Sequence, residues 1–227
     1  MHFDIAISVG SNCQSRYNIS RVLFSRYSDD KKSFSLQDPL VKSRDFGSFF
    51  FDWSVTPVHS SKQILCRDFK DVLELENLKI ASLNDGTQTI IDTASGCSYP
   101  HTFPKTQTGE CTTDLLEEAY PKVRDKYDYI IHKTKEVFRS EKKILCVLTG
   151  NHADNDVIEL CDIIEKLTSN FSLLYTPWEN KTGFDEVDNT NFDSRIIKRP
   201  IKHAPYPGDF NSWKSAFNGI SFGPIES

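Results

Sequence analysis

Residues 142–156 read KKILCVLTGNHADND, and this stretch decides the fold class of the chain. Its first part, 142–149, is a nearly continuous apolar run, which is typical of a strand buried on both faces of a parallel sheet. A polar loop follows, and the apolar residues of 156–168 then recur at helical spacing. Two more apolar runs, 171–177 and 194–200, predict further strands. This alternation predicts an α/β fold, a three-layer sandwich with a mostly parallel central sheet.

The N-terminal part of the chain repeats the pattern. Residues 3–9 predict a short buried strand that ends at Gly10, and a helix follows to about residue 26. The polar and charged segment 28–45 predicts a loop insertion. Because 227 residues suit one α/β domain, we expect a single domain, 1–227, with that insertion.

The middle of the chain predicts four more elements. Each is indicated by its apolar periodicity and by the turn residues that flank it. They are a helix from Ser60 or Ser61 to about residue 74, strands at 78–83 and 89–94, and a long helix at 113–139 broken or started at Pro121.

Composition excludes several classes of function. The formal net charge is −5, which argues against a nucleic-acid partner held by phosphate contacts. No apolar run reaches the length of a membrane-spanning helix, and the first ten residues lack the pattern of a signal peptide. None of the six cysteines forms a C-x-x-C pair, and three of them stand in apolar stretches where free cysteine is a small buried residue. With no signal peptide or membrane span predicted, we expect a reduced, cytoplasmic protein.

Two polar loops follow predicted strands, GSNCQS at 10–15 and TGNHADND at 149–156. Ligands of open α/β sheets bind outside the carboxyl ends of the strands, so both loops are candidate site elements. Cys13 stands where a helix is predicted to begin, and free backbone N–H groups there lower a thiol's pKa. With the side chain of Asn12 or Gln14, the same N–H groups can hold an oxyanion.

A thiolate nucleophile needs a base, which is usually histidine. His101 is the first candidate, because prolines stiffen its loop and aromatic residues surround it. His152, in the second polar loop, is another candidate for the site, and Asp52 either orients a histidine or anchors its own loop. The structural alternatives stay open: Cys13 as a core residue and His101 as a structural histidine.

A metal site is not expected from the sequence. The three residues with the best spacing for one lack the C-x-x-C knuckle of structural zinc sites. They are Cys97, His101 and Cys111.

Three motifs carry a resemblance to a known family: SVGSNCQ, FFFDWSV, and YPHTF followed by KVRDKYDYIIHK. In this order they resemble the papain-like cysteine peptidase family of bacteria and large DNA viruses, often encoded among polysaccharide-biosynthesis genes. The resemblance covers residues 3 to about 150 and implies Cys13 and His101 as the catalytic pair. The family usually has His-Asp-Phe where this chain has residues 101–103, and arginines where it has 129–131.

The motif GSNCQ also resembles a capsule-biosynthesis acetyltransferase family that presents a cysteine after its first strand. That family has an SGNH-like fold, related in its layers to Rossmann-like sheets. The resemblance implies an acyl donor such as a coenzyme A thioester, with no cofactor required.

We therefore expect a cysteine-dependent acyl-transfer or hydrolytic enzyme that acts on a small-molecule, glycan or peptide substrate. Cys13 would attack the acyl carbon and His101 would take the thiol proton. A glycosyltransferase or other sugar-modifying enzyme is one alternative, and a non-catalytic binding module is another. The expected oxyanion or substrate-binding residues are Ser11, Asn12, Gln14, Asp52 and His152.

Overall fold

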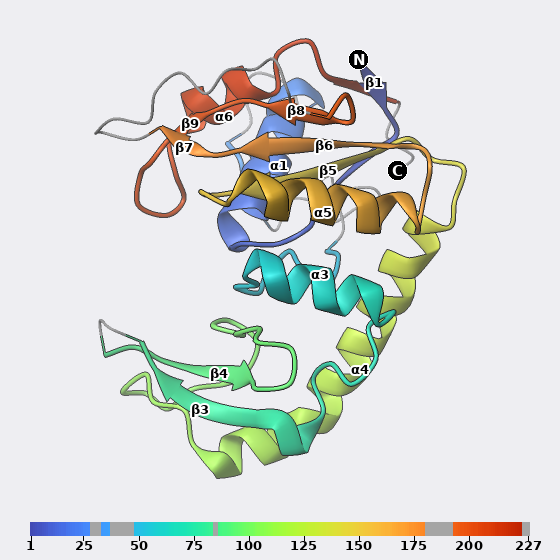
Figure 1. Ribbon diagram of the computed structural model, residues 1–227. Helices are drawn as coiled ribbons and strands as arrows, with labels where there is room; N and C mark the ends of the chain where they lie inside the picture. Colours follow the sequence, from blue (N-terminus) through green and yellow to red (C-terminus); the bar gives the residue numbers. More distant parts are fainter. Residues whose placement is uncertain (28–32, 37–47, 84–85, 180–192, 224–227) are drawn as a thin grey trace.

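The protein is a mixed α/β structure built on a parallel central sheet (Figure 1). The sheet has four strands in the order β2 (Ile5–Ser8), β5 (Ile144–Thr149), β6 (Phe171–Thr176) and β8 (Ile196–Lys198). The predicted fold class is thereby confirmed. The computed structural model describes residues 1–27, 33–36, 48–83, 86–179 and 193–223.

The register of the sheet brings the carboxyl ends of its strands to one edge. Ile5 pairs with Ile144, and Ile144 pairs in turn with Phe171, all in parallel. Leu173 continues the ladder to Ile196 on the last strand. The loops after β2, β5 and β6 therefore leave the sheet at the same edge, where ligands of parallel sheets bind.

Helices cover the two faces of the sheet, and side chains alternate between them along each strand. Leu145 of β5 packs with α1 (Cys13–Tyr27) and α6 (Phe210–Ala216), whereas Cys146 belongs to the cluster on the opposite face. That opposite face is covered by α5 (Asp154–Glu165). Two helical layers thus enclose the sheet.

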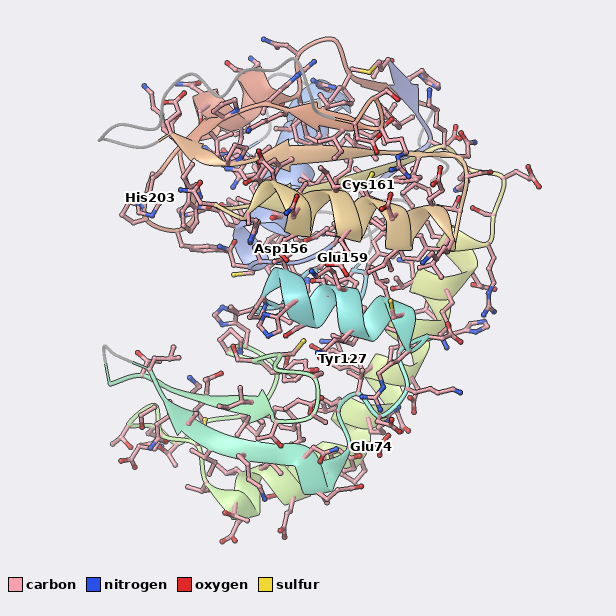
Figure 2. The ribbon with its side chains drawn as sticks, viewed as in Figure 1. Glu74, Tyr127, Asp156, Glu159, Cys161 and His203 are labelled. Carbon is pink, nitrogen blue, oxygen red and sulfur yellow. The ribbon has the colours of Figure 1, made fainter. Side chains whose placement is uncertain are left out.

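A second helix, α3 (Val58–Cys66), packs along α5 on the outer side (Figure 1). Lys62 Nζ lies 2.7 Å from Asp156 Oδ1 and also contacts Glu159. Figure 2 labels both carboxylates on the side of α5 that faces α3. The ion pairs fix the two helices side by side, and α5 carries the loop that precedes it at the sheet edge.

Four short strands form two separate two-stranded sheets. Both pairs are parallel, like the central strands. The pairs are β1 (His2–Phe3) with β10 (Ser221–Phe222), and β7 (Trp178–Glu179) with β9 (Ile201–Lys202).

A hairpin lobe stands beside this α/β body. It consists of η1 (Leu75–Asn77) and the antiparallel strands β3 (Leu78–Ser82) and β4 (Gln88–Asp92). The long helix α4 (Thr113–Phe138) runs from the hairpin toward the sheet (Figure 1). The turn predicted between the strands includes residues 84–85, which lie outside the described residues.

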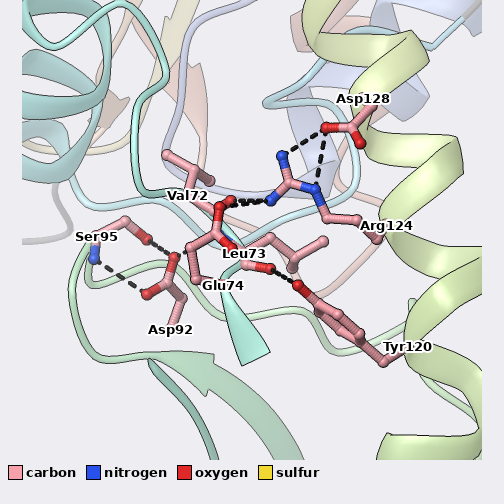
Figure 3. A network of polar contacts seen from close by, with 8 residues as sticks. All are labelled: Val72, Leu73, Glu74, Asp92, Ser95, Tyr120, Arg124 and Asp128. Atoms are coloured by element: carbon pink, nitrogen blue, oxygen red, sulfur yellow. Dashed lines mark hydrogen bonds and ion pairs between the residues drawn. The ribbon is translucent and has the colours of Figure 1, made fainter. Parts of the chain in front are cut away.

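Polar contacts to α4 hold the hairpin lobe in place (Figure 3). Arg124 donates to the carbonyl of Val72 at 2.6 Å and lies 3.2 Å from Glu74 Oε1. The Tyr120 hydroxyl donates to the carbonyl of Leu73 at 3.2 Å. One helix thereby fixes the chain that leads into β3.

The structure departs from the sequence prediction at two helices. The helix expected to reach residue 74 ends at Cys66, because Asp68 and Phe69 then adopt positive φ angles of 52° and 59° that no α-helix accommodates. Pro121 lies inside α4 without ending it.

Two further expectations concern the chain as a whole. Most of the predicted insertion at 28–45 lies outside the described residues; only 33–36 are described. No helix in the described part of the chain is long and apolar enough to cross a membrane.

Candidate functional site

The site is built on the sharp turn between β2 and α1. Gly10 has φ +137°, and a Cβ there would lie 2.3 Å from Ser61 Oγ and 3.1 Å from the Thr56 carbonyl, so only glycine fits. Ser11 follows with φ +74°, which is unusual for a residue with a side chain. Ser11 N donates to the Thr56 carbonyl at 2.8 Å, and Thr56 N donates back at 3.1 Å. These bonds hold a strained strand-to-helix turn, a feature common at functional sites.

A hydrogen bond joins this turn to the loop after β5. Ser11 Oγ lies 2.9 Å from His152 Nε2, although the two residues are 141 positions apart. The same Nε2 lies 3.0 Å from the Thr149 carbonyl oxygen. Because a carbonyl can only accept, this geometry assigns the ring proton to Nε2 and leaves Nδ1 as the basic nitrogen. Ser11 Oγ then accepts from the ring, and its own proton remains available to another acceptor.

His152 is held by its backbone as well as by its ring. Its N–H donates to the Tyr175 hydroxyl at 3.0 Å, and that hydroxyl lies 3.2 Å from the His152 carbonyl. Burial lowers the pKa of His152 below its ordinary value, while the Thr149 carbonyl and the Asp156 carboxylate oppose the shift. The imidazole is therefore neutral near pH 7 and can accept a proton.

Cys13 is the first residue of α1 and is partly exposed. Burial raises the pKa of its thiol, and its own backbone N–H acts in the opposite direction with a smaller effect. The sequence predicted the reverse, a thiol pKa lowered by the helix start. Burial removes water that would stabilise the thiolate, and the backbone N–H group offsets only part of that loss. The free protein therefore holds Cys13 as a thiol and not as a thiolate.

The backbone at the start of α1 offers hydrogen-bond donors beside this thiol. The N–H groups of Asn12 and Cys13 donate to no other described residue. Asn12 Oδ1 accepts from Gln14 N at 2.9 Å and so caps the helix. Gln14 Nε2 donates to the Ala204 carbonyl at 3.3 Å, so its amide holds another segment of chain.

For two other predicted site residues, no hydrogen bond to Cys13 or His152 is found among the described residues. His101 is exposed in the turn after Tyr99, and no described residue forms a hydrogen bond or ion pair with its side chain. Asp52 is buried, accepts from Phe49 N at 2.7 Å and pairs with Arg16. It therefore anchors its own turn to α1, and no described histidine hydrogen-bonds to it.

Aromatic residues that the sequence analysis did not single out line the same edge. Trp178 Cζ2, His152 Nε2 and Ser11 Oγ all lie 3.7–3.9 Å from the position that a Cβ on Gly150 would occupy. His203, labelled in Figure 2, packs edge-on against Trp178 with ring centroids 4.6 Å apart. Trp178 directly follows the predicted strand at 171–177, so the rule that ligands bind at strand ends would have found it.

The three residues considered for a metal do not gather. Cys97 and Cys111 are buried, whereas His101 is exposed. Cys97 Sγ lies 3.3 Å from Thr56 Oγ1, and burial raises the pKa of Cys97 to about 11. Among the described residues, no group of three or more His, Cys, Asp and Glu side chains is arranged to hold a metal ion.

No protein-family model, curated protein or solved structure matches this chain. The chemistry of the site must then be derived from the residues gathered at the sheet edge. They supply a thiol at Cys13, a neutral imidazole at His152, a hydroxyl at Ser11 and the backbone N–H groups of Asn12 and Cys13, which donate to no other described residue. Nucleophile, base and oxyanion donors are the groups that acyl transfer requires.

Proposed function

We propose that the protein is a cysteine-dependent acyl-transfer or hydrolytic enzyme, with Cys13 as nucleophile and His152 as base. The observation that carries the proposal is the 2.9 Å contact between Ser11 Oγ and His152 Nε2. This contact links the neutral His152 to Ser11, and Cys13 follows Ser11 by two residues in the same turn. His101, the base implied by the family resemblance, has no such tie to this turn.

The proposed reaction begins from the neutral pair of thiol and imidazole. Cys13 Sγ forms a bond to the acyl carbon as its proton passes to His152 Nδ1. The carbonyl oxygen becomes an oxyanion, stabilised by the N–H groups of Asn12 and Cys13 and by the Ser11 hydroxyl. The imidazolium keeps the proton on Nε2, and this N–H still donates to the Thr149 carbonyl.

The second half of the reaction releases the products. The proton on Nδ1 passes to the leaving group as the oxyanion collapses and the bond to that group breaks, which leaves a thioester on Cys13. Water, or the hydroxyl or amine of an acceptor, then attacks the thioester while His152 takes its proton and returns it to sulfur. Water as the attacking group gives a hydrolase, and an acceptor gives a transferase; small-molecule, glycan and peptide substrates all suit this chemistry.

Turnover of p-nitrophenyl acetate by four variants tests the proposal. We expect Cys13→Ala to abolish turnover and His152→Gln to lower kcat by about 10²–10⁴-fold, the usual contribution of a general base. Ser11→Ala should lower kcat less than His152→Gln does. His101→Gln is the matched histidine control and should turn over like the unaltered protein.

The opposite pattern would overturn the assignment. Full turnover by Cys13→Ala rejects the nucleophile, and loss of turnover in His101→Gln but not in His152→Gln rejects the base. An inactive unaltered protein that binds a nucleotide sugar would favour the sugar-modifying alternative.

A further inference from the structure

A segment near the C-terminus, residues 203–209, lies across the first turns of α1. Gln14 Nε2 donates to the Ala204 carbonyl at 3.3 Å, and Asn18 Nδ2 donates to the Pro207 carbonyl at 2.6 Å. Gly208 has φ +91°, and a Cβ there would lie 2.6 Å from Gln14 Nε2. The segment is therefore fixed closely against the helix that begins with Cys13.

The segment places Tyr206 at the end of a row of aromatic rings. The centroid of Tyr206 lies 5.4 Å from that of Tyr17, which lies 5.3 Å from Phe34. Phe34 in turn packs 5.5 Å from Phe24, which is buried. These ring contacts connect Tyr206 to the buried Phe24 and so hold its ring in place.

The row runs on the same side of α1 as the thiol. Residues four apart on a helix lie on one face, so Tyr17 stands one turn beyond Cys13. Burial and the neighbouring Cys13 and Tyr17 groups raise the pKa of Tyr206 to about 12, in keeping with a hydroxyl near both. Arg16, the basic residue nearest along the helix, is turned away and pairs with buried Asp52.

Although it is anchored, Tyr206 remains 56% exposed. A large aromatic ring held at a fixed place beside a nucleophile, and left open to solvent, offers apolar surface to a ligand. We infer that Tyr206 is a specificity-determining residue whose ring packs against the acyl group of a substrate bound at Cys13. The preferred acyl group is then uncharged and carries an apolar chain. This inference rests on the proposed function.

A chain-length series of p-nitrophenyl esters tests it. Each methylene buried on the ring is worth at most about fourfold in kcat/KM. We expect the unaltered protein to prefer the hexanoate over the acetate by about tenfold or more. Tyr206→Ala should lose most of that preference, and Tyr206→Phe should keep it because the ring remains.

Three controls make the result decisive. Tyr129→Ala removes a tyrosine that is 68% exposed on α4, and it should leave the preference unchanged. Thermal unfolding checks that Tyr206→Ala folds. Cys13→Ala separates the two claims: if it still hydrolyses the esters, the proposed function fails.

If Cys13→Ala is inactive while Tyr206→Ala keeps the full hexanoate preference, the inference about Tyr206 alone is wrong. The same conclusion follows if the unaltered protein shows no preference between the two esters. A preference lost equally in Tyr206→Phe would assign the selectivity to the hydroxyl group and would also overturn the role of the ring.

Discussion

Arg16 Nε lies 3.4 Å from Asp52 Oδ2 in an ion pair that is buried on both sides. Arg16 belongs to the first turn of α1, and Asp52 belongs to the turn in the motif FFFDW. The Phe49 N–H also donates to Asp52 Oδ2, at 2.7 Å. The pair therefore joins the helix that presents Cys13 to a turn far away in the sequence.

Removal of Asp52 should destabilise the protein strongly. Asp52→Ala leaves the Arg16 guanidinium buried without its partner, which typically costs about 3–5 kcal/mol. Urea unfolding measures the loss. Glu136→Ala is the matched control, because Glu136 pairs with His132 at 3.4 Å where both side chains are exposed. That variant should stay within about 1 kcal/mol of the unaltered protein, and an equal loss in both would contradict a structural role for the buried pair.

The stability of the protein should depend on pH through His152. Burial lowers the pKa of His152 in the folded state below its ordinary value of 6.5, so the unfolded chain binds the proton more readily. The stability that the protein gains from holding His152 neutral is complete above pH 6.5, and it is lost as the pH falls toward the lowered pKa of the folded state. The free energy of unfolding, measured by urea titration between about pH 5 and pH 8, should therefore fall on acidification.

Replacement of His152 by Gln should make that pH profile flatter. His132→Gln removes a side chain that is 72% exposed and should leave the profile as it is. A slope that is the same in His152→Gln and in the unaltered protein would show that His152 does not titrate as its burial requires.

A chain of buried hydroxyl groups lies under the site. Thr149 Oγ1 is 2.7 Å from Ser15 Oγ and 3.0 Å from Thr176 Oγ1, and Thr176 Oγ1 donates to the Leu148 carbonyl at 3.2 Å. Thr149→Val breaks the chain and should cost about 1–3 kcal/mol, because buried hydroxyl groups lose their partner. Urea unfolding measures this cost.

The Ser15→Ala variant sharpens the test of the hydroxyl chain. If Ser15 bonds to Thr149, the cost of the double variant should be less than the sum of the two single costs. Strictly additive costs would mean that the two hydroxyl groups do not interact. Thr108→Val, at an exposed hydroxyl, should change the stability by no more than about 0.5 kcal/mol.

Gly10 should not tolerate a side chain. Gly10→Ala combines a φ of +137° with a Cβ only 2.3 Å from Ser61 Oγ, and we expect it to cost about 2–4 kcal/mol in urea unfolding. Gly109 also has a positive φ, +85°, but its Cβ would meet nothing within 4 Å. Gly109→Ala should therefore cost only about 1–2 kcal/mol, and an equal cost at Gly10 would show that the turn can move away from α3.

Much of the fold follows from the pattern of apolar residues. The strand predicted at 142–149 is β5, and the strand predicted at 171–177 is β6, because runs buried on both faces cannot alternate with polar residues. The helix after Ser60 was predicted too long. Periodicity shows which residues face inward, but it does not show the positive φ angles of Asp68 and Phe69 that end the helix early.

The location of the site could be predicted from the sequence, but the hydrogen bonds between its residues could not. The rule about strand ends found both loops, which include Ser11 and His152. It could not show that these two side chains meet, because their contact depends on the φ angle of Ser11 and on the Thr149 carbonyl. The burial that raises the pKa of Cys13 depends on side chains distant in the sequence and so was also out of reach.

We propose that Cys13 forms the acyl-enzyme and that His152 is its base. Peptide mass spectrometry after a brief reaction with p-nitrophenyl acetate tests it directly, with the exposed Cys66 as an internal reference thiol. We expect an acetyl group on the Cys13 peptide in the unaltered protein and in His101→Gln, and about 10²-fold slower acetylation of Cys13 in His152→Gln. Acetylation of Ser11 instead, equal labelling of Cys13 and Cys66, or loss of labelling in His101→Gln alone would show that Cys13 and His152 are not the catalytic pair.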